Sequence, residues 1–354
     1  MNLVRVREGQ TEIFVPEHEK GLGPKSSKKD IFYNPAMELN RDISVAFLKA
    51  FGGDELKVLD GMAASGVRGI RIAKEVGVKE VVLTDLSEES VSLIEKNIEE
   101  TGIQAEAINE SMEENLLHNR HHYDYIDVDP FGSPVKYFPW AARFVKRGGI
   151  VAVSATDTAV LCGTYPKKCY RLYSSRPENN WCKHENGLRI LIAYCAREAA
   201  RFQRSVKPLL SYYDGHHFRT YLKVDESAKE ADEALSYLSK FRFGEIGWEK
   251  DTETGPFWAG DIFDMELLKD MHPLGTLDDD LLELWKGEAP MPPFFYDTNI
   301  LGRYHKSAPP PLDDMIEAID SRSDGFTATK THFSPTGFKT DAPEKEVMEI
   351  FSDL

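Results

Sequence analysis

The sequence is poor in cysteine and has no long hydrophobic run, and each shortage excludes a class of protein. Its four cysteines are Cys162, Cys169, Cys182 and Cys195, and none of them forms a Cys-x-x-Cys pair of the kind that binds zinc. Four cysteines in 354 residues fit free thiols in a reducing compartment better than a disulfide scaffold. No apolar run approaches the roughly 18 residues of a membrane helix, and the N-terminus lacks the apolar core of a secretory signal. We therefore expect a cytoplasmic protein with no membrane segment.

Positive charge is also in deficit, because 59 acidic residues outnumber 43 basic ones and give a net charge of −16. This balance argues at first against a nucleic-acid partner. The charges are unevenly distributed, however: residues 136–207 contain 14 Lys and Arg against 4 Asp and Glu, whereas residues 225–288 contain 6 against 18. A polyanion would be attracted by the first segment and repelled by the second. On charge alone, two solvated faces of opposite sign are an alternative to a binding footprint.

Strand-like and helix-like segments alternate along the first two thirds of the chain. The apolar segments that read as strands are residues 56–62, 80–86, 105–111, 123–130 and 150–157. This alternation predicts an α/β fold with a doubly wound, mostly parallel sheet. A hairpin within residues 1–29 and a helix over 34–51 precede it; a long helix over 187–206 and two strands over 208–225 follow.

The composition shifts after residue 225. Residues 230–244 read as a helix and 256–261 as a loop, and a proline-rich stretch follows. We place a domain boundary here, with the α/β domain over 1–224 and a smaller α+β domain over 225–354.

The turn after the first strand, VLDGMAASGVRG, follows Asp60 with the small residues Ala63, Ser65 and Gly66. It is not a phosphate-binding P-loop, because Val67 stands where the lysine is required, nor a dinucleotide fingerprint, because position 63 is not glycine. A small-residue turn before a helix N-terminus lets the backbone approach a carboxylate and an adenosine. It is the usual first motif of S-adenosylmethionine (SAM) methyltransferases, although a plain packing turn would read similarly.

The ends of the second and third strands extend this interpretation. Asp85 ends the second strand, where an acid is placed to bind both ribose hydroxyls of an adenosine; its alternative role is in a helix N-terminal cap. Residues 109–112 follow the third strand, and we expect Ser111 and Met112 among them to frame the adenine.

The stretch YIDVDPFGSP leaves the fourth strand through Asp129, Pro130 and Phe131. An exocyclic base amine is a poor nucleophile, because its lone pair is delocalised into the ring. A carboxylate and a backbone carbonyl that accept its two N–H bonds would localise that lone pair and aim it at a methyl donor. Asp129 and the Pro130 carbonyl supply both acceptors, and Phe131 can stack on the base. The motif follows the logic of the Asp/Asn-Pro-Pro-aromatic motif of amino-methyltransferases, whereas Asp127 is expected to orient the loop.

Six segments together resemble the tRNA guanine-26 N2-dimethyltransferase family, in its archaeal type, nearly end to end. They are FYNPAMELNRD, GMAASGVRGIR, DVDPFGSP, LCGTYPKKCYRLYSSRP, LLSYYDGHHFRTY and THFSPTGFKTDAP. The resemblance implies a Rossmann-like SAM-methyltransferase domain and a smaller C-terminal domain that assists with tRNA. It also implies methylation, with SAM, of the N2 amine of guanine 26 in tRNA to the mono- and dimethyl forms.

The resemblance also implies residue roles. Asp129 matches the catalytic aspartate, and Phe131 and Phe32 match aromatics that sandwich the guanine. Arg41 and Arg68 match arginines that contact SAM and could meet its carboxylate, and Asp85 matches the ribose ligand.

The chain departs from the family in two places. Many relatives carry paired cysteines before the GPFWAG segment, and this chain has none there, so we predict no zinc. Ser111-Met112 stands where relatives tend to have Asp-Ala.

A guanine inside folded tRNA must leave its stack before it can react, and affinity for the tRNA should come from phosphates and shape. Our candidate backbone contacts are Lys136, Lys167, Lys168, Arg171 and Arg176. We expect a monomer. Two alternatives are an amino-methyltransferase for another RNA or DNA base and a non-catalytic RNA-binding module, although a pure binder has no need of Asp60, Asp85 and Asp129 together.

Overall fold

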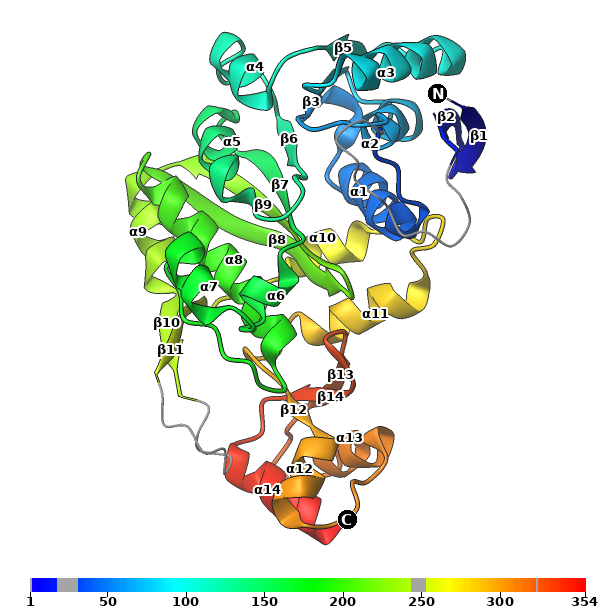
Figure 1. Cartoon of the computed structure of the whole chain (residues 1–354). Helices are drawn as coiled ribbons and strands as arrows, with labels where there is room; N and C mark the ends of the chain where they lie inside the picture. Colours follow the sequence, from blue (N-terminus) through cyan, green and yellow to red (C-terminus); the bar gives the residue numbers. More distant parts are fainter. Residues whose placement is uncertain (1, 18–30, 243–252, 323) are drawn as a thin grey trace.

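The computed structural model describes residues 2–17, 31–242, 253–322 and 324–354. Its main body is built on a seven-stranded sheet with the order β5-β4-β3-β6-β7-β9-β8, and a smaller lobe at the C-terminus lies below it in Figure 1. The strands are β3 (Lys57–Asp60), β4 (Glu80–Thr84), β5 (Glu106–Ile108), β6 (Tyr125–Val128), β7 (Gly149–Ala155), β8 (Arg204–Asp214) and β9 (His217–Glu226). The first five are parallel, and β9 runs antiparallel to both β7 and β8. The predicted doubly wound, mostly parallel sheet is therefore confirmed.

Helices cover the sheet and surround its edges. Those before β8 are α1 (Glu38–Ala50), α2 (Val67–Arg71), which continues as a π-helical turn (Ile72–Val76), α3 (Glu88–Thr101), α4 (Met112–His118), α5 (Phe138–Phe144), α6 (Thr158–Leu161), α7 (Pro166–Tyr173) and α8 (Lys183–Ala200); short 3-10 turns lie at Pro35–Met37, Gly53–Glu55 and Pro134–Lys136. Those after β9 are α9 (Ala228–Ser236), α10 (Met265–Asp270), α11 (Asp279–Glu288), α12 (Thr298–His305), α13 (Leu312–Asp320) and α14 (Glu344–Asp353). None of the described helices is both long and apolar enough to cross a bilayer.

Local sequence signals explain several of these boundaries. Asn34 accepts a hydrogen bond from Ala36 N (3.0 Å) and caps the short 3-10 turn that leads into α1. Ser87 accepts from Ser90 N and caps the start of α3. Gly52 follows α1 with φ 85°, a left-handed conformation that suits glycine and ends the helix.

The N-terminal hairpin is confirmed as β1 (Leu3–Glu8) and β2 (Thr11–Pro16). It is attached to α3 through Asn97, whose side chain donates to Phe14 O (2.9 Å) and accepts from Phe14 N (2.7 Å). Residues 18–30, which follow the hairpin, lie outside the described residues.

Three predictions from residue 187 onward differ from the structure. The long helix begins at Lys183 and ends at Ala200, because the chain from Arg204 onward enters β8. The segment expected to be helical to residue 244 leaves the helix at Ser236, and Leu238–Phe241 forms β10, which pairs with β11 (Thr254–Trp258), part of which we expected to be a loop. The reason is tertiary: Phe257 and Trp258 are buried in the main core, and that packing outweighs local helix propensity.

The hydrophobic residues form two cores. The larger follows the central sheet and also takes in Leu267, Leu282 and Trp285, so α10 and α11 pack on the main body. The smaller core belongs to the lobe of α12–α14 with β12 (Tyr296–Asp297), β13 (Ala328–Thr331) and β14 (Ser334–Thr340). The chain after residue 225 therefore contributes to both cores, and a domain boundary near residue 225 stays a prediction.

A buried ionic network joins the small lobe to the main body. Lys339 of β14 is 1% exposed and donates to Glu185 Oε1 of α8 (2.7 Å), and its Nζ lies 3.6 Å from Glu288 Oε1 of α11. Glu185 also accepts from Arg189 Nε (2.8 Å), and Glu288 contacts His332 Nδ1 (2.5 Å). Burial raises the pKa of Glu288, but the charges of His332 and Lys339 outweigh it and lower the pKa to about 2.

Candidate active site

The carboxyl ends of β3, β4 and β6 bring the predicted acids to one edge of the sheet. Asp60 ends β3 and stands opposite Asp127 of β6 in the ladder, while Asp85 and Asp129 come directly after β4 and β6. Residues far apart in sequence meet here because parallel strands end at the same edge.

The turn after β3 is tied to Asp85. Ala64 N donates to Asp85 Oδ2 (2.8 Å), and Ser87 N donates to Asp85 Oδ1 (2.9 Å). Ala64 has φ 50° and Gly66 φ 76°, and a Cβ on Gly66 would lie 2.9 Å from Ile94. Only glycine meets both demands without strain at position 66. Ala63 and Ser65 are buried beside it, and the small side chains leave the backbone free to approach a ligand.

The residues after β5 have structural contacts of their own. Ser111 and Glu114 form a capping box at the start of α4, in which the Ser111 side chain is fully engaged. Met112 is 1% exposed and packs against Gly61, where an added Cβ would meet its side chain at 2.6 Å. Their contact with adenine stays a prediction.

Sequence reasoning missed Leu86, which follows Asp85 and is 76% exposed. A leucine exposed in this way, beside an acid that could hold a ribose, offers an apolar surface to a flat ring. The available signal was an apolar residue directly after the acidic end of a strand.

Asp60 is buried at 3% exposure and accepts from Gly69 N (3.0 Å). Burial and the nearby negative charge of Asp127 raise its pKa to about 7, against the opposing charge of Arg68. Asp60 is thus partly protonated near neutral pH and holds the start of α2 against the strand edge.

A chain of ion pairs runs from Asp129 into the protein interior through Arg68, Asp127 and Arg219. Arg219 of β9 donates to both Asp127 oxygens (3.1 and 2.5 Å), and Arg68 Nε lies 3.6 Å from Asp127 Oδ1. Arg68 also donates through Nη1 to Ser44 Oγ (2.8 Å) and through Nη2 to Asp129 Oδ2. Asp127 therefore positions both arginines from beneath the loop that carries Asp129.

The electrostatics keep Asp129 ionised. Burial raises its pKa, but the positive charges of Arg68 and Arg219 outweigh that effect, so the pKa of Asp129 lies below its usual range. A carboxylate of this kind is a hydrogen-bond acceptor at all physiological pH values.

His217 at the start of β9 is a second residue that sequence reasoning missed. It is 1% exposed, and its Nε2 lies 2.6 Å from Asn40 Nδ2, which also donates to Tyr212 OH (3.1 Å). Burial lowers the pKa of His217 to about 4 although Asp129 opposes this, so the ring is neutral near pH 7.

Phe32 and Phe131, which we predict to sandwich the guanine, contact each other at the loop that carries Asp129. Their ring centroids are 4.8 Å apart with an interplanar angle of 89°, and Phe131 is 68% exposed. A base held between two parallel rings needs centroids roughly 7 Å apart, which is two contact distances of about 3.5 Å. The sandwich that we predict therefore requires one ring to turn and the pair to separate.

The loop of Asp129–Ser133 is held from two sides. Thr156, just after β7, accepts from Gly132 N through Oγ1 (2.7 Å) and donates its own N–H to Gly132 O (2.9 Å). Tyr173 at the end of α7 shares a hydrogen bond with Ser133 Oγ (2.7 Å) and donates to Asp157 Oδ1 (2.8 Å). Neither Thr156 nor Tyr173 was a sequence-predicted site residue.

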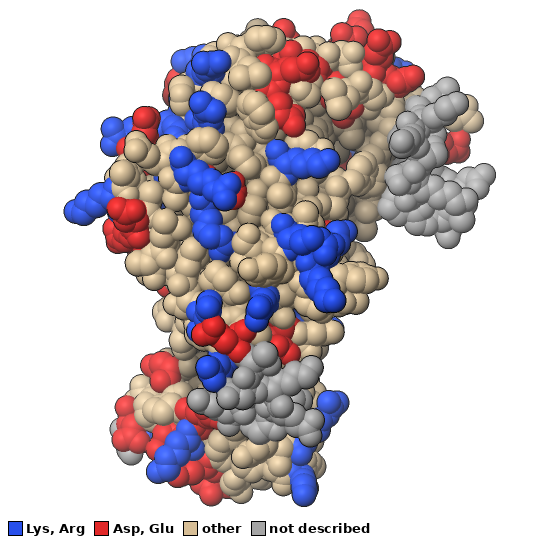
Figure 2. Space-filling model, turned by 60° about the vertical axis from the view of Figure 1, so that its left-hand side comes forward, with Lys and Arg blue, Asp and Glu red and all other residues tan. Residues whose placement is uncertain are grey.

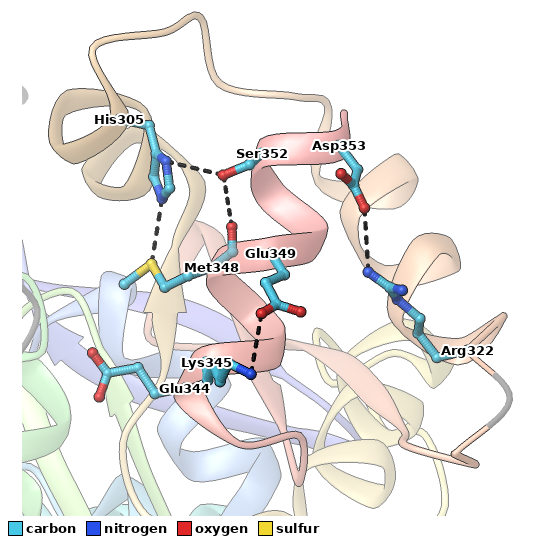
Figure 3. A pocket seen from close by; sticks show the side chains of 8 residues that line it. All are labelled: His305, Arg322, Glu344, Lys345, Met348, Glu349, Ser352 and Asp353. Atoms are coloured by element: carbon cyan, nitrogen blue, oxygen red, sulfur yellow. Dashed lines mark hydrogen bonds and ion pairs between the residues drawn. The ribbon is translucent and has the colours of Figure 1, made fainter.

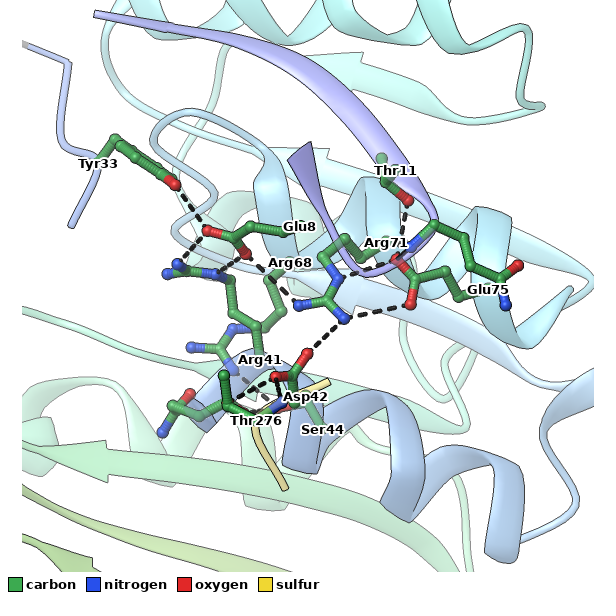
Figure 4. A network of polar contacts seen from close by, with 12 residues as sticks. Glu8, Thr11, Tyr33, Arg41, Asp42, Ser44, Arg68, Arg71, Glu75 and Thr276 are labelled. Atoms are coloured by element: carbon green, nitrogen blue, oxygen red, sulfur yellow. Dashed lines mark hydrogen bonds and ion pairs between the residues drawn. The ribbon is translucent and has the colours of Figure 1, made fainter. Parts of the chain in front are cut away.

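Arg41 is part of a buried network that fixes the N-terminal hairpin to α1 (Figure 4). Its Nε and Nη2 donate to the two Glu8 oxygens (2.7 and 2.5 Å), and Tyr33 OH donates to Glu8 Oε1 (2.7 Å). Arg71 then joins Glu8 to Asp42 (3.4 and 2.6 Å). The predicted contact between Arg41 and a SAM carboxylate is untested, but the arginine has a structural partner that sequence reasoning did not anticipate.

The predicted RNA contacts occupy an exposed surface. Lys136, Lys167, Lys168, Arg171 and Arg176 are all exposed, and across the described parts of the chain none of them is in an ion pair within 4 Å. Other cations of residues 136–207 are less available to a ligand, because they are paired or buried. Lys146, Arg147 and Lys207 form ion pairs, and Arg189 and Arg204 are buried. Figure 2 shows Lys and Arg gathered over the middle of the main body, with Asp and Glu more frequent along its upper edge.

An open cavity of about 710 Å³ lies in the small lobe, between α12 and α14. Figure 3 shows His305 facing Met348 and Ser352, with Glu349 and Asp353 along the same helix. These residues are far in the fold from the strand ends that carry Asp60, Asp85 and Asp129, so this cavity is not the candidate active site. Among the described residues no group of three or more His, Cys, Asp or Glu could hold a metal ion.

Comparisons with known proteins agree on one family. The model of the family described as "N2,N2-dimethylguanosine tRNA methyltransferase" matches residues 9–352. A protein of Thermococcus kodakarensis named tRNA (guanine(26)-N(2))-dimethyltransferase is 40% identical over 100% of both chains, and one of the same name from Pyrobaculum aerophilum is 37% identical over 99% of this chain and 96% of its own. The solved structure of Trm1 from Pyrococcus horikoshii with S-adenosyl-L-methionine superposes with a TM-score of 0.89 at 32% identity, and covers 98% of this chain and 99% of that one.

Proposed function

The chain belongs to the N2,N2-dimethylguanosine tRNA methyltransferase family, and on that premise we propose that it uses SAM to methylate the N2 amine of guanine 26 in tRNA, once and then again. The observation that carries the proposal is the position of Asp129. It leaves the carboxyl end of β6 as an ionised carboxylate and is flanked by an exposed aromatic pair.

The described residues fit SAM. When bound, SAM supplies a sulfonium methyl group. Each Asp85 oxygen accepts one backbone N–H, and a carboxylate oxygen can accept a second hydrogen bond, so Asp85 retains capacity for ribose hydroxyls. The left-handed turn at Ala64 and Gly66 brings backbone close to the same place, and Leu86 would cover one face of the adenine.

Asp129 and the carbonyl of Pro130 act on the guanine amine. Each would accept one N2–H bond, which draws the nitrogen lone pair out of conjugation and fixes its direction. The low pKa of Asp129 makes it a weak base toward a neutral amine. Once the nitrogen has gained a methyl group and a positive charge, its proton is strongly acidic, and even a weakly basic carboxylate can receive it.

Affinity for tRNA would come from the exposed, unpaired cations. Lys136 follows the Asp129 loop, and Lys167, Lys168 and Arg171 lie on α7, which Tyr173 connects to that loop. Phosphates bound by these cations would hold the tRNA with the target nucleotide near Phe131.

Product analysis tests the reaction. We would incubate the protein with SAM and an unmodified tRNA transcript, digest the RNA and identify the nucleosides by mass. N2-methyl- and N2,N2-dimethylguanosine are expected, and a transcript with adenine at position 26 should give neither. A methyl group on adenosine or cytidine would overturn the proposed target.

The Asp129→Asn variant tests the mechanism. The amide keeps the shape but replaces one acceptor oxygen by an NH2 donor group and removes the charge, so single-turnover methyl transfer should fall by about 10²–10⁴-fold, while the Kd for tRNA changes less than twofold. Activity within tenfold of wild type would show that the amine is activated by another group. Loss of tRNA binding in parallel would assign Asp129 a binding role instead.

A further inference from the structure

Helix α7 exposes two tyrosines that the reaction itself does not use. Tyr165, the residue before the helix, and Tyr170 on its outer side are each 57% exposed. The opposite side of α7 is apolar, with Cys169 and Tyr173 at 0% exposure. The helix is thus anchored on one side and presents aromatic rings to solvent on the other, which a purely structural helix does not require.

Basic side chains surround both rings. Lys167 and Lys168 lie between the tyrosines in sequence, Arg171 follows Tyr170, and the Arg176 guanidinium lies 5.9 Å from the Tyr170 ring centroid. These four cations have no acidic partner within 4 Å among the described residues. Exposed aromatics among unneutralised cations combine the two features that bind single-stranded nucleic acid, because phosphates meet the charges and base faces meet the rings.

The surface is mechanically connected to the reaction centre. Tyr173 ends α7 and bonds Ser133, four residues after Asp129, and the same hydroxyl reaches Asp157 beyond β7. The α7 segment also follows β7 at the edge of the sheet where Asp60, Asp85 and Asp129 gather. Nucleotides held on α7 would therefore lie next to the nucleotide that enters the site.

We propose that Tyr165 and Tyr170 form a stacking platform for nucleotides of the tRNA that flank the extruded guanine. Extruding one base removes a stacking partner from each of its neighbours, and that cost must be recovered. A tyrosine face replaces the lost partner for any base, because every base has a π-face. The inference rests on the proposed function and adds to it a platform for bases other than the target.

Binding measurements with matched variants test the platform. Tyr165→Ala and Tyr170→Ala should each weaken binding of the unmodified transcript by about fivefold or more, the lower range for loss of one base–aromatic stack. Tyr165→Phe and Tyr170→Phe keep the ring and should bind within twofold of wild type. Tyr304→Ala removes a tyrosine of similar exposure (50%) on α12 and serves as the control for loss of an exposed ring.

The dependence on salt separates stacking from charge. The alanine variants should leave the slope of log Kd against log salt unchanged, whereas Lys167→Ala with Lys168→Ala should reduce it. Alanine variants that bind within twofold of wild type, or phenylalanine variants that lose as much as alanine, would overturn the platform. Failure of the wild-type protein to bind or methylate the transcript would instead overturn the proposed function.

Discussion

Replacing Lys339 by methionine should destabilise the joint between the small lobe and the main body. The lysine ammonium is 1% exposed and lies between Glu185 and Glu288, and methionine fills similar space without charge. Removing one partner of a buried ionic network leaves uncompensated charge and costs roughly 3–5 kcal/mol. Arg189 and His332 still face the two carboxylates, so we expect a loss near the lower end, about 3 kcal/mol.

The control comes from the neighbouring strand. Lys330 of β13 pairs with Asp313 at 2.7 Å, but the two side chains are 52% and 76% exposed. Lys330→Met should therefore cost less than about 1 kcal/mol. Urea unfolding followed by tryptophan fluorescence would compare the two variants, because Trp285 lies in α11 and Trp181 bonds Phe295 O beside the joint (2.8 Å).

The loss of stability caused by Lys339→Met should also depend on pH. The folded pKa of Glu288 is about 2, below the ordinary value of 4.5. A depressed carboxylate pKa contributes stability that is full above pH 4.5 and is lost as pH falls toward 2. The difference between wild type and Lys339→Met should accordingly narrow below pH 4.5. Equal stability of the two lysine variants at pH 7 would refute the account of a buried ionic joint.

Three further outcomes follow from the site. Arg68→Gln removes the charge that lowers the pKa of Asp129. The pKa of Asp129 should rise, and the acid limb of the pH–rate profile should therefore move to higher pH. An unchanged profile with only a raised KM for SAM would assign Arg68 to the cofactor alone. Asp60→Asn removes a carboxyl whose folded pKa is raised to about 7. A raised acid pKa lowers stability as pH rises from 3.8 to 7, so the stability of the variant relative to wild type should increase between pH 5 and 8. Thermal unfolding would measure this, and a difference that stays constant with pH would contradict it. Leu86→Ser should weaken SAM binding by calorimetry about fivefold, since covering part of a leucine is worth roughly 1 kcal/mol, and should leave the thermal midpoint unchanged; equal affinity would remove Leu86 from the site.

Several features could be read from the chain because their causes are local. Alternating apolar segments predicted the parallel sheet. Asn34 and Ser87 cap helix starts through their own side-chain acceptors, which is also a local effect. The acids at strand ends followed from topology, since parallel strands must end at one edge. The resemblance implies that Phe32 and Phe131 hold the guanine between them, which stays a prediction; in the structure the two rings contact each other.

Contacts between residues that are distant in sequence could not be predicted from local patterns. No pattern near Arg41 points to Glu8, which comes from the N-terminal hairpin, and none near Arg68 says that it would lie between Asp127 and Asp129. The same holds for β10 and β11, where burial of Phe257 against the main core overrode the helical signal.

The sequence by itself determined the fold class and the edge of the sheet where the acids gather, because these depend on periodicity and turn residues. It also predicts Asp129 as the reacting carboxylate, from a motif of adjacent positions. Only the tertiary structure decided which exposed cations have no acidic partner among the described residues, how Asp129 stays ionised, and how α7 is connected to the loop that carries Asp129. Those properties depend on burial and on charges brought together across the chain, and a local pattern of residues contains neither.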